Sequence, residues 1–206
     1  MQLSQELNTT IALARTAGKA IMEFYDSDFL VEEKTTTDNH TEPVTIADKT
    51  ASRIIVEGLA EKFPDDGILS EEETDTDHRL DKKRLWLIDP MDGTKGFVQK
   101  NGDFAVQIGL AEDGEMILGV VFLPFYKQLY FATKGNGAFL VENDETPKRL
   151  RVSGKTDFSK MTIAVSRDHR SGKMSNIIEH FGILNETQRG SVGLQIGLIE
   201  TQICDL

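Results

Sequence analysis

Residues 85–94 of this chain read Leu-Trp-Leu-Ile-Asp-Pro-Met-Asp-Gly-Thr. The first four residues are all apolar, a pattern typical of a strand that is buried on both faces. The apolar run stops at Asp89, and a second carboxylate, Asp92, follows three positions later. Because Pro90 fixes its own φ angle and restricts the backbone of Asp89, the acid side chains are held in place. The segment therefore predicts a buried strand that ends in two fixed carboxylates.

The elements around this segment predict an α+β fold. Apolar residues recur every three or four positions from Leu3 to Tyr25, so we expect a long amphipathic helix there. A second helix is expected to open at Thr45 and to end before Pro64. Four apolar strands with Gly-containing turns between the members of each pair predict an antiparallel meander. These strands are expected at 104–111, 116–123, 128–133 and 137–141.

The remaining segments suggest a second, smaller unit. Residues 32–41 are polar without periodicity and are predicted to form a mobile loop. The chain becomes polar again at 142–155, where we place a domain boundary. A strand, a helix and an apolar segment are expected beyond it, at 161–165, 171–181 and 194–203. We therefore predict an N-terminal α+β domain over residues 1–148 and a partial C-terminal α/β domain over residues 149–206.

Composition and charge exclude several functional classes. With 206 residues, 39% hydrophobic and 28% charged, the chain has an ordinary globular composition, and no apolar stretch is long enough for a membrane span. The N-terminus has neither a basic leader nor a continuous apolar block, which predicts a cytoplasmic protein. The single cysteine, Cys204, excludes an internal disulfide and a Cys-based metal site. A net charge of −11 argues against binding to a nucleic acid polymer.

Three acidic groups stand where chain elements begin or end: Asp48, residues 71–73, and the pair Asp89 and Asp92. Each has an ordinary structural interpretation, respectively a helix capping box, a solvated loop and a tight turn. If they converge, however, the carboxylates repel one another and raise one another's pKa values, a penalty that divalent cations remove. Oxygen-only ligands suit Mg²⁺ or Mn²⁺, whereas zinc sites more often use Cys or His. The four histidines are scattered through the chain, and only His169 is kept as a candidate.

A helix beginning after Asp92 would point its free N–H groups at the same place, and Gly93 would let the backbone come close. Metals and a helix terminus together would bind a phosphate monoester without an arginine. An acidic chain can therefore carry a phosphoryl-transfer site.

Three motifs in this order resemble those of the inositol monophosphatase superfamily, a group of Mg²⁺-dependent, lithium-sensitive phosphatases. The motifs are Pro43-Val44-Thr45-x-x-Asp48, Glu71-Glu72 and Asp89-Pro90-Met91-Asp92-Gly93-Thr94. The resemblance covers essentially the whole chain. Within the superfamily, three further stretches look more like the bacterial 3′(2′),5′-bisphosphate nucleotidases. They are residues 93–97, residues 101–106 and Ser166-Arg167-x-His169.

The resemblance implies a role for each matching residue. Glu71, Asp89 and the Met91 carbonyl would hold a first metal, and Asp89 and Asp92 would share a second. Asp48 and Glu71 would flank the activated water and any third ion, and Thr94 would orient that water. The backbone amides of Gly93 and Thr94 would hold the phosphate. Five further residues would lie toward the substrate: Lys95, Ser166, Arg167, His169 and Ser191.

The resemblance also implies the layered α/β/α/β fold of the inositol monophosphatase and fructose bisphosphatase type. The family's closing Trp-Asp motif has no counterpart before Asp205 and Leu206, so we expect an incomplete second domain and an underligated second metal. Apolar surface exposed by that gap would be covered in a homodimer.

The implied reaction is hydrolysis of 3′-phosphoadenosine 5′-phosphate to AMP and phosphate by a metal-activated water, with a role in sulfur metabolism. Two or three Mg²⁺ ions would take part, with Mn²⁺ able to substitute. The alternatives are an inositol or other sugar phosphatase, and a truncated relative that binds metal and nucleotide without turnover. A haloacid-dehalogenase-type phosphatase is disfavoured because it needs Asp-x-Asp, whereas two residues separate Asp89 from Asp92.

Overall fold

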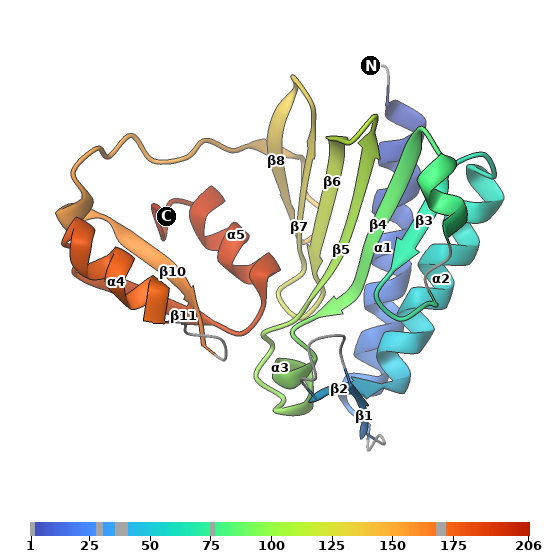
Figure 1. Ribbon diagram of the computed structural model, residues 1–206, viewed down its shortest axis with the longest axis horizontal. Coiled ribbons are helices and arrows are strands. Elements are labelled where there is room, and N and C mark those ends of the chain that lie inside the picture. The colour runs from blue at the N-terminus through green and yellow to red at the C-terminus, as the bar shows by residue number, and fades with distance from the viewer. Residues whose placement is uncertain (1–2, 28–30, 36–40, 75–76, 168–171) are drawn as a thin grey trace.

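A seven-stranded sheet lies at the centre of the computed structural model, which describes residues 3–27, 31–35, 41–74, 77–167 and 172–206 (Figure 1). The strand order is β3-β4-β5-β6-β7-β8-β9, and only β3 and β4 run parallel. The strands are β3 Gly67–Ser70, β4 Arg84–Asp92, β5 Ala105–Glu112, β6 Glu115–Leu123, β7 Gln128–Thr133, β8 Gly137–Glu142 and β9 Lys148–Arg149. The predicted meander is therefore confirmed.

Two long helices, α1 Ser4–Tyr25 and α2 Ile46–Lys62, cover one face of this sheet (Figure 1). The main core lies between them and the strands, where Trp86 and Ile88 of β4 are buried. Side chains alternate along a strand, so Leu87 and Asp89 lie on the other face. The helices thus fix which face of β4 presents its carboxylate.

The C-terminal elements lie on the side of the sheet away from α1 and α2 (Figure 1). Helix α5 Val192–Glu200 contacts β5 and β6 on one side and β10 and β11 on the other. Strands β10 Thr162–Ser166 and β11 Asn185–Arg189 form a parallel pair, and α4 Gly172–Phe181 follows β10. The layers are thus two helices, a sheet, a helix and a second sheet, which confirms the predicted fold class. The boundary between residues 148 and 149 stays a prediction.

The sequence predictions were wrong in two places. Residues 32–41 were expected to be a loop, but β1 Val31–Thr35 pairs antiparallel with β2 Thr41–Thr45; residues 36–40 lie outside the described part. This pair is polar, so its pattern did not mark it as a strand. Strand β4 was expected to stop at Asp89, but it continues to Asp92 because β5 goes on pairing with it.

A β-bulge explains how β4 continues past its proline. Asp89 pairs with Gln107 and Asp92 with Ala105, so three steps along β4 match two along β5. Residues three apart on a regular strand point to opposite faces, and the one extra residue returns Asp92 to the face of Asp89. The two carboxylates therefore share a face because of the bulge.

The remaining short elements are α3 Thr94–Val98 and two 3₁₀ turns, η1 Asp77–Asp81 and η2 Phe158–Lys160. Among the residues that the structure describes, no helix has both the length and the apolar character needed to cross a membrane.

Candidate active site

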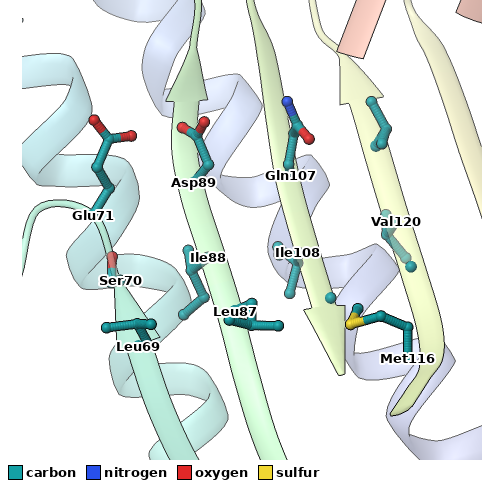
Figure 2. A pocket seen from close by; sticks show the side chains of 13 residues that line it. Leu69, Ser70, Glu71, Leu87, Ile88, Asp89, Gln107, Ile108, Met116 and Val120 are labelled. Carbon is teal, nitrogen blue, oxygen red and sulfur yellow. The ribbon is translucent and has the colours of Figure 1, made fainter. Parts of the chain in front are cut away.

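Glu71 and Asp89 lie side by side just beyond the last paired residues of the parallel strands β3 and β4 (Figure 2). The register places Ser70 beside Ile88, and the Glu71 amide donates to the Ile88 carbonyl at 3.1 Å. Burial is the largest cause of a strongly raised pKa at Asp89, followed by the nearby carboxylates of Glu71 and Asp92. Asp89 Oδ1 is buried and has no hydrogen-bond partner. The structure therefore brings like charges together and leaves one oxygen unsatisfied.

Asp92 receives hydrogen bonds from both halves of the chain. Its Oδ2 accepts from Gln107 Nε2 at 2.7 Å, from the Gly193 amide at 2.8 Å and from the Ser191 hydroxyl. Burial raises the pKa of Asp92 even though these hydrogen bonds lower it. The position of this carboxylate thus depends on the first turn of α5 as well as on β4.

Asp48 confirms the capping-box interpretation and also reaches the predicted site. Its Oδ2 accepts from the Thr45 amide and hydroxyl, each at 2.7 Å, at the start of α2. Its Oδ1 accepts from the Thr94 hydroxyl at 3.0 Å. Burial outweighs these hydrogen bonds and raises the pKa of Asp48 to about 6. One carboxylate therefore both caps a helix and faces the Asp89–Thr94 segment.

Thr94 joins Asp48 to the end of β4. Its hydroxyl lies 3.2 Å from the Met91 carbonyl as well as within reach of Asp48. The preceding Gly93 has φ +90°, and a Cβ there would stand 2.3 Å from the Asp103 carbonyl, so only glycine fits. As expected, a helix, α3, begins after Asp92. Phosphate binding by the amides of Gly93 and Thr94 stays a prediction.

We tested whether these residues fit the cations that the sequence implies. Within the described ranges, no three His, Cys, Asp or Glu side chains stand close enough together to count as a metal-binding group. The chemistry of the donors nevertheless fits: the cluster offers only oxygen atoms, burial and repulsion disfavour the charged form of Asp89, and Asp89 Oδ1 lacks a partner. Hard divalent cations relieve both conditions. The assignment of individual ligands stays a prediction.

The residues predicted to contact substrate lie in different surroundings, and their role stays a prediction. Ser191 is fully buried and donates to Asp92, while the Arg167 guanidinium pairs with Asp103. Ser166 ends β10, and Lys95 lies in the first turn of α3. His169 falls outside the described residues.

Three residues of the site were not singled out from the sequence. Gln107 and Asp103 contact Asp92 and Arg167 respectively, and Arg189 lies beside Asp103. For Asp103 a signal existed: it stands in the stretch of residues 101–106, which resembled the nucleotidases but received no role. The other two contacts depend on strand pairing that the sequence pattern does not report.

A hollow of about 560 Å³ lies beside the carboxylates on the sheet face away from α1 and α2 (Figure 2). Glu71, Asp89 and Gln107 lie at one end of it, and the rest of its lining is mostly apolar. The apolar lining includes Leu69, Leu87, Met116 and Val121. Carboxylates at the edge of a concave surface are a common arrangement for a ligand site.

Comparison with known proteins places this arrangement in a family. The model of the inositol monophosphatase family matches residues 2–205. A 3′(2′),5′-bisphosphate nucleotidase CysQ of Salmonella typhimurium is 37% identical over 186 residues, covering 90% of this chain and 73% of that protein.

Solved structures agree with the sequence comparison. The extragenic suppressor protein suhB from Bartonella henselae superimposes with a TM-score of 0.82 at 28% identity, covering 98% of this chain and 76% of its own. CysQ from Bacteroides thetaiotaomicron, a bacterial member of the inositol monophosphatase family, superimposes with a TM-score of 0.76 at 28% identity. The match covers 95% of this chain and 76% of that one. Sequence, fold and the order of the acidic motifs lead to one conclusion: this chain belongs to the inositol monophosphatase family.

Proposed function

We propose that this chain is a metal-dependent phosphatase whose substrate is a 3′(2′),5′-bisphosphate nucleotide such as 3′-phosphoadenosine 5′-phosphate. The observation that carries the proposal is the pair Glu71 and Asp89, which lie side by side just after β3 and within β4, where burial and then the charges of Glu71 and Asp92 raise the pKa of Asp89. Membership of the family and the CysQ relatives support the reaction and the nucleotide substrate.

The chain's own residues have distinct parts in this proposal. Glu71, Asp89, Asp92 and the Met91 carbonyl would hold the cations, which lower the pKa of a bound water and offset charge on the leaving oxygen. Thr94 donates its proton to Asp48 or Met91, which leaves its oxygen lone pairs free to accept from the attacking water. Asp48 fixes the direction of the Thr94 hydroxyl, so the water is positioned for attack in line with the ester oxygen.

Finer parts of the proposal rest on the family resemblance. They are Mg²⁺ as the natural ion, two or three ions per site, inhibition by lithium, a cytoplasmic location and a homodimer. Substrate contacts by Lys95, Ser166, Arg167 and His169 belong to the same proposal.

The test is phosphate release from 3′-phosphoadenosine 5′-phosphate and from inositol 1-phosphate, with and without Mg²⁺. We expect Mg²⁺-dependent release with a higher kcat/KM for the nucleotide. Asp89→Asn should abolish it, because the variant loses a charged oxygen ligand. Asp66→Asn is a matched control, since Asp66 accepts from Trp86 Nε1 at 2.9 Å, far from β4's carboxyl end.

Each other outcome has a defined meaning. Faster turnover of inositol 1-phosphate would move the assignment to the sugar-phosphate alternative. Mg²⁺-dependent nucleotide binding without release of phosphate from either compound would favour the non-catalytic alternative. Full activity in Asp89→Asn would contradict the proposed site.

A further inference from the structure

Asp103 is a buried carboxylate that receives groups from two separate strands. It is only 3% exposed, and its Oδ2 accepts from the Arg167 guanidinium and from the Gly190 amide at 3.1 Å. Arg189 Nε stands 4.0 Å from its Oδ1. Arg167 follows β10 and Arg189 is the last residue of β11. The Asp103 side chain therefore contacts the C-terminal ends of both strands.

The backbone of Asp103 is fixed against the end of β4. Its amide donates to Asn101 Oδ1 at 2.9 Å. A Cβ added at Gly93 or at Gly96 would stand 2.3 or 2.4 Å from the Asp103 carbonyl oxygen. No side chain fits at those two glycines without a shift. Asp103 therefore touches the Asp92–Thr94 segment with its backbone and the C-terminal strands with its side chain.

The Gly190 amide, which donates to Asp103, lies in the same turn as the groups that donate to Asp92. Gly190 is followed by Ser191, whose hydroxyl donates to Asp92, and the Gly193 amide donates to the same oxygen. Asp103 and Asp92 thus bind successive parts of one turn, residues 190–193. If the first contact is lost, the turn can move, and the donors that align the Asp92 carboxylate move with it.

We propose that Asp103 is a positioning residue for the reaction: its carboxylate sets the 190–193 turn and Arg167, and through the turn it sets the orientation of Asp92. Asp103 itself stays bound to Arg167 and Gly190 and contacts neither substrate nor cation. The kinetic part of this proposal rests on the proposed function, whereas the structural part does not.

The test compares Asp103→Asn with Asp205→Asn. Asp205 is a matched control because it is also a buried carboxylate, bound to Lys155 Nζ and to the Thr162 amide, each at 2.8 Å. Amide hydrogen exchange at Gly190 and Gly193, followed by NMR, reports the turn without requiring activity. We expect Asp103→Asn to speed exchange at both amides by about tenfold or more, since a charged acceptor is lost. Asp205→Asn should leave these amides unchanged.

In the phosphatase assay, Asp103→Asn should lower kcat/KM by about 10- to 100-fold, because small misplacements at a reacting centre have effects of this size. The loss should fall mainly on kcat, and Asp205→Asn should retain kcat even where its melting temperature falls. Unchanged exchange at Gly190 and Gly193 would overturn the proposal. The proposal would also be overturned if both variants lost kcat to the same extent as their melting temperatures fell.

Two further controls keep the result interpretable. If the wild-type protein releases no phosphate, the proposed function fails while the exchange experiment still decides the role of Asp103. If Asp103→Asn does not fold, Arg167→Gln removes one donor from the half-exposed side of the same contact. That variant should speed exchange at Gly190, and wild-type exchange there would count against the proposal.

Discussion

Asp48, Asp89 and Asp92 all have pKa values above the ordinary value for an aspartate, and burial is the largest cause at each. Hydrogen bonds to Asp48 and Asp92 offset part of the cost of burying their charges, whereas Asp89 Oδ1 accepts no hydrogen bond. Of these three carboxylates, Asp89 is therefore the one left with a buried oxygen that no hydrogen bond stabilises.

A substitution at Asp89 should have opposite effects on stability without and with Mg²⁺. In EDTA, Asp89→Asn should melt no lower than the wild type, because it removes a buried group repelled by Glu71 and Asp92. With Mg²⁺ at 100 times its Kd, the wild type should gain about 2.7 kcal/mol and the variant much less. Thermal melts of both proteins, with Asp66→Asn as the control that keeps the gain, measure this. A full Mg²⁺ gain in Asp89→Asn would show that the ion binds elsewhere.

At the scale of elements, the start of α2 and the candidate site share one hydrogen-bonded group. Thr45 caps the helix by accepting from the Ala47 amide at 3.2 Å, and its own amide and hydroxyl donate to Asp48. The Asp48 carboxylate then reaches Thr94 with its other oxygen. Helix capping and orientation of the site therefore depend on the same side chains.

Removal of this cap should affect both properties together. Thr45→Ala should lower the free energy of unfolding by about 1 kcal/mol, the usual cost of a lost N-cap, and should also lower kcat because Asp48 loses one of its donors. Thr45→Ser keeps the hydroxyl and should preserve both. Chemical denaturation and phosphate release measure the two effects. Loss of stability with an unchanged kcat would separate the cap from the site.

The sequence predicted the elements that carry a strong hydrophobic period and missed those that do not. Helices α1 and α2 and the meander are confirmed, because their apolar residues repeat at helix or strand spacing. Strand β11, with the sequence Asn-Glu-Thr-Gln-Arg, has no such pattern and exists because it pairs with β10. The pairing of β4 with β5 brings Gln107 to Asp92, and the pairing of β10 with β11 brings Arg167 and Arg189 to Asp103; the sequence pattern reports neither pairing.

At the scale of the whole molecule, pH should act on stability in two opposite directions. Hydrogen bonds from Lys155, Ser153 and Thr162 lower the pKa of Asp205 to about 2, so its contribution is present above about pH 4 and is lost as pH falls toward 2. Burial raises the pKa of Asp48 to about 6 and raises that of Asp89 further, so their contribution is present below about pH 4 and is lost as pH rises.

Metal-free protein should therefore be most stable at about pH 4 and lose stability as pH rises above it, and added Mg²⁺ should move that optimum upward by stabilising the ionised carboxylates. Melting temperatures measured from acid to alkaline pH, in EDTA and in Mg²⁺, give the two profiles. Asp205→Asn should flatten the acid limb only. A metal-free profile that climbs steadily to neutral pH would contradict the raised pKa values.

The single extra residue in β4 makes the length of this segment as important as its composition. Inserting one more residue between Asp89 and Asp92, with the bulge kept, would match four steps along β4 to three along β5 and would turn one acid toward the helices. Deleting one residue would remove the bulge and leave the acids two apart on a regular strand, where they still share a face. The shared face of the two acids should therefore survive a one-residue deletion and be lost on a one-residue insertion. Comparison of one-residue insertions with one-residue deletions at positions 90 and 91, by the Mg²⁺-dependent rise in melting temperature, would reveal this asymmetry directly.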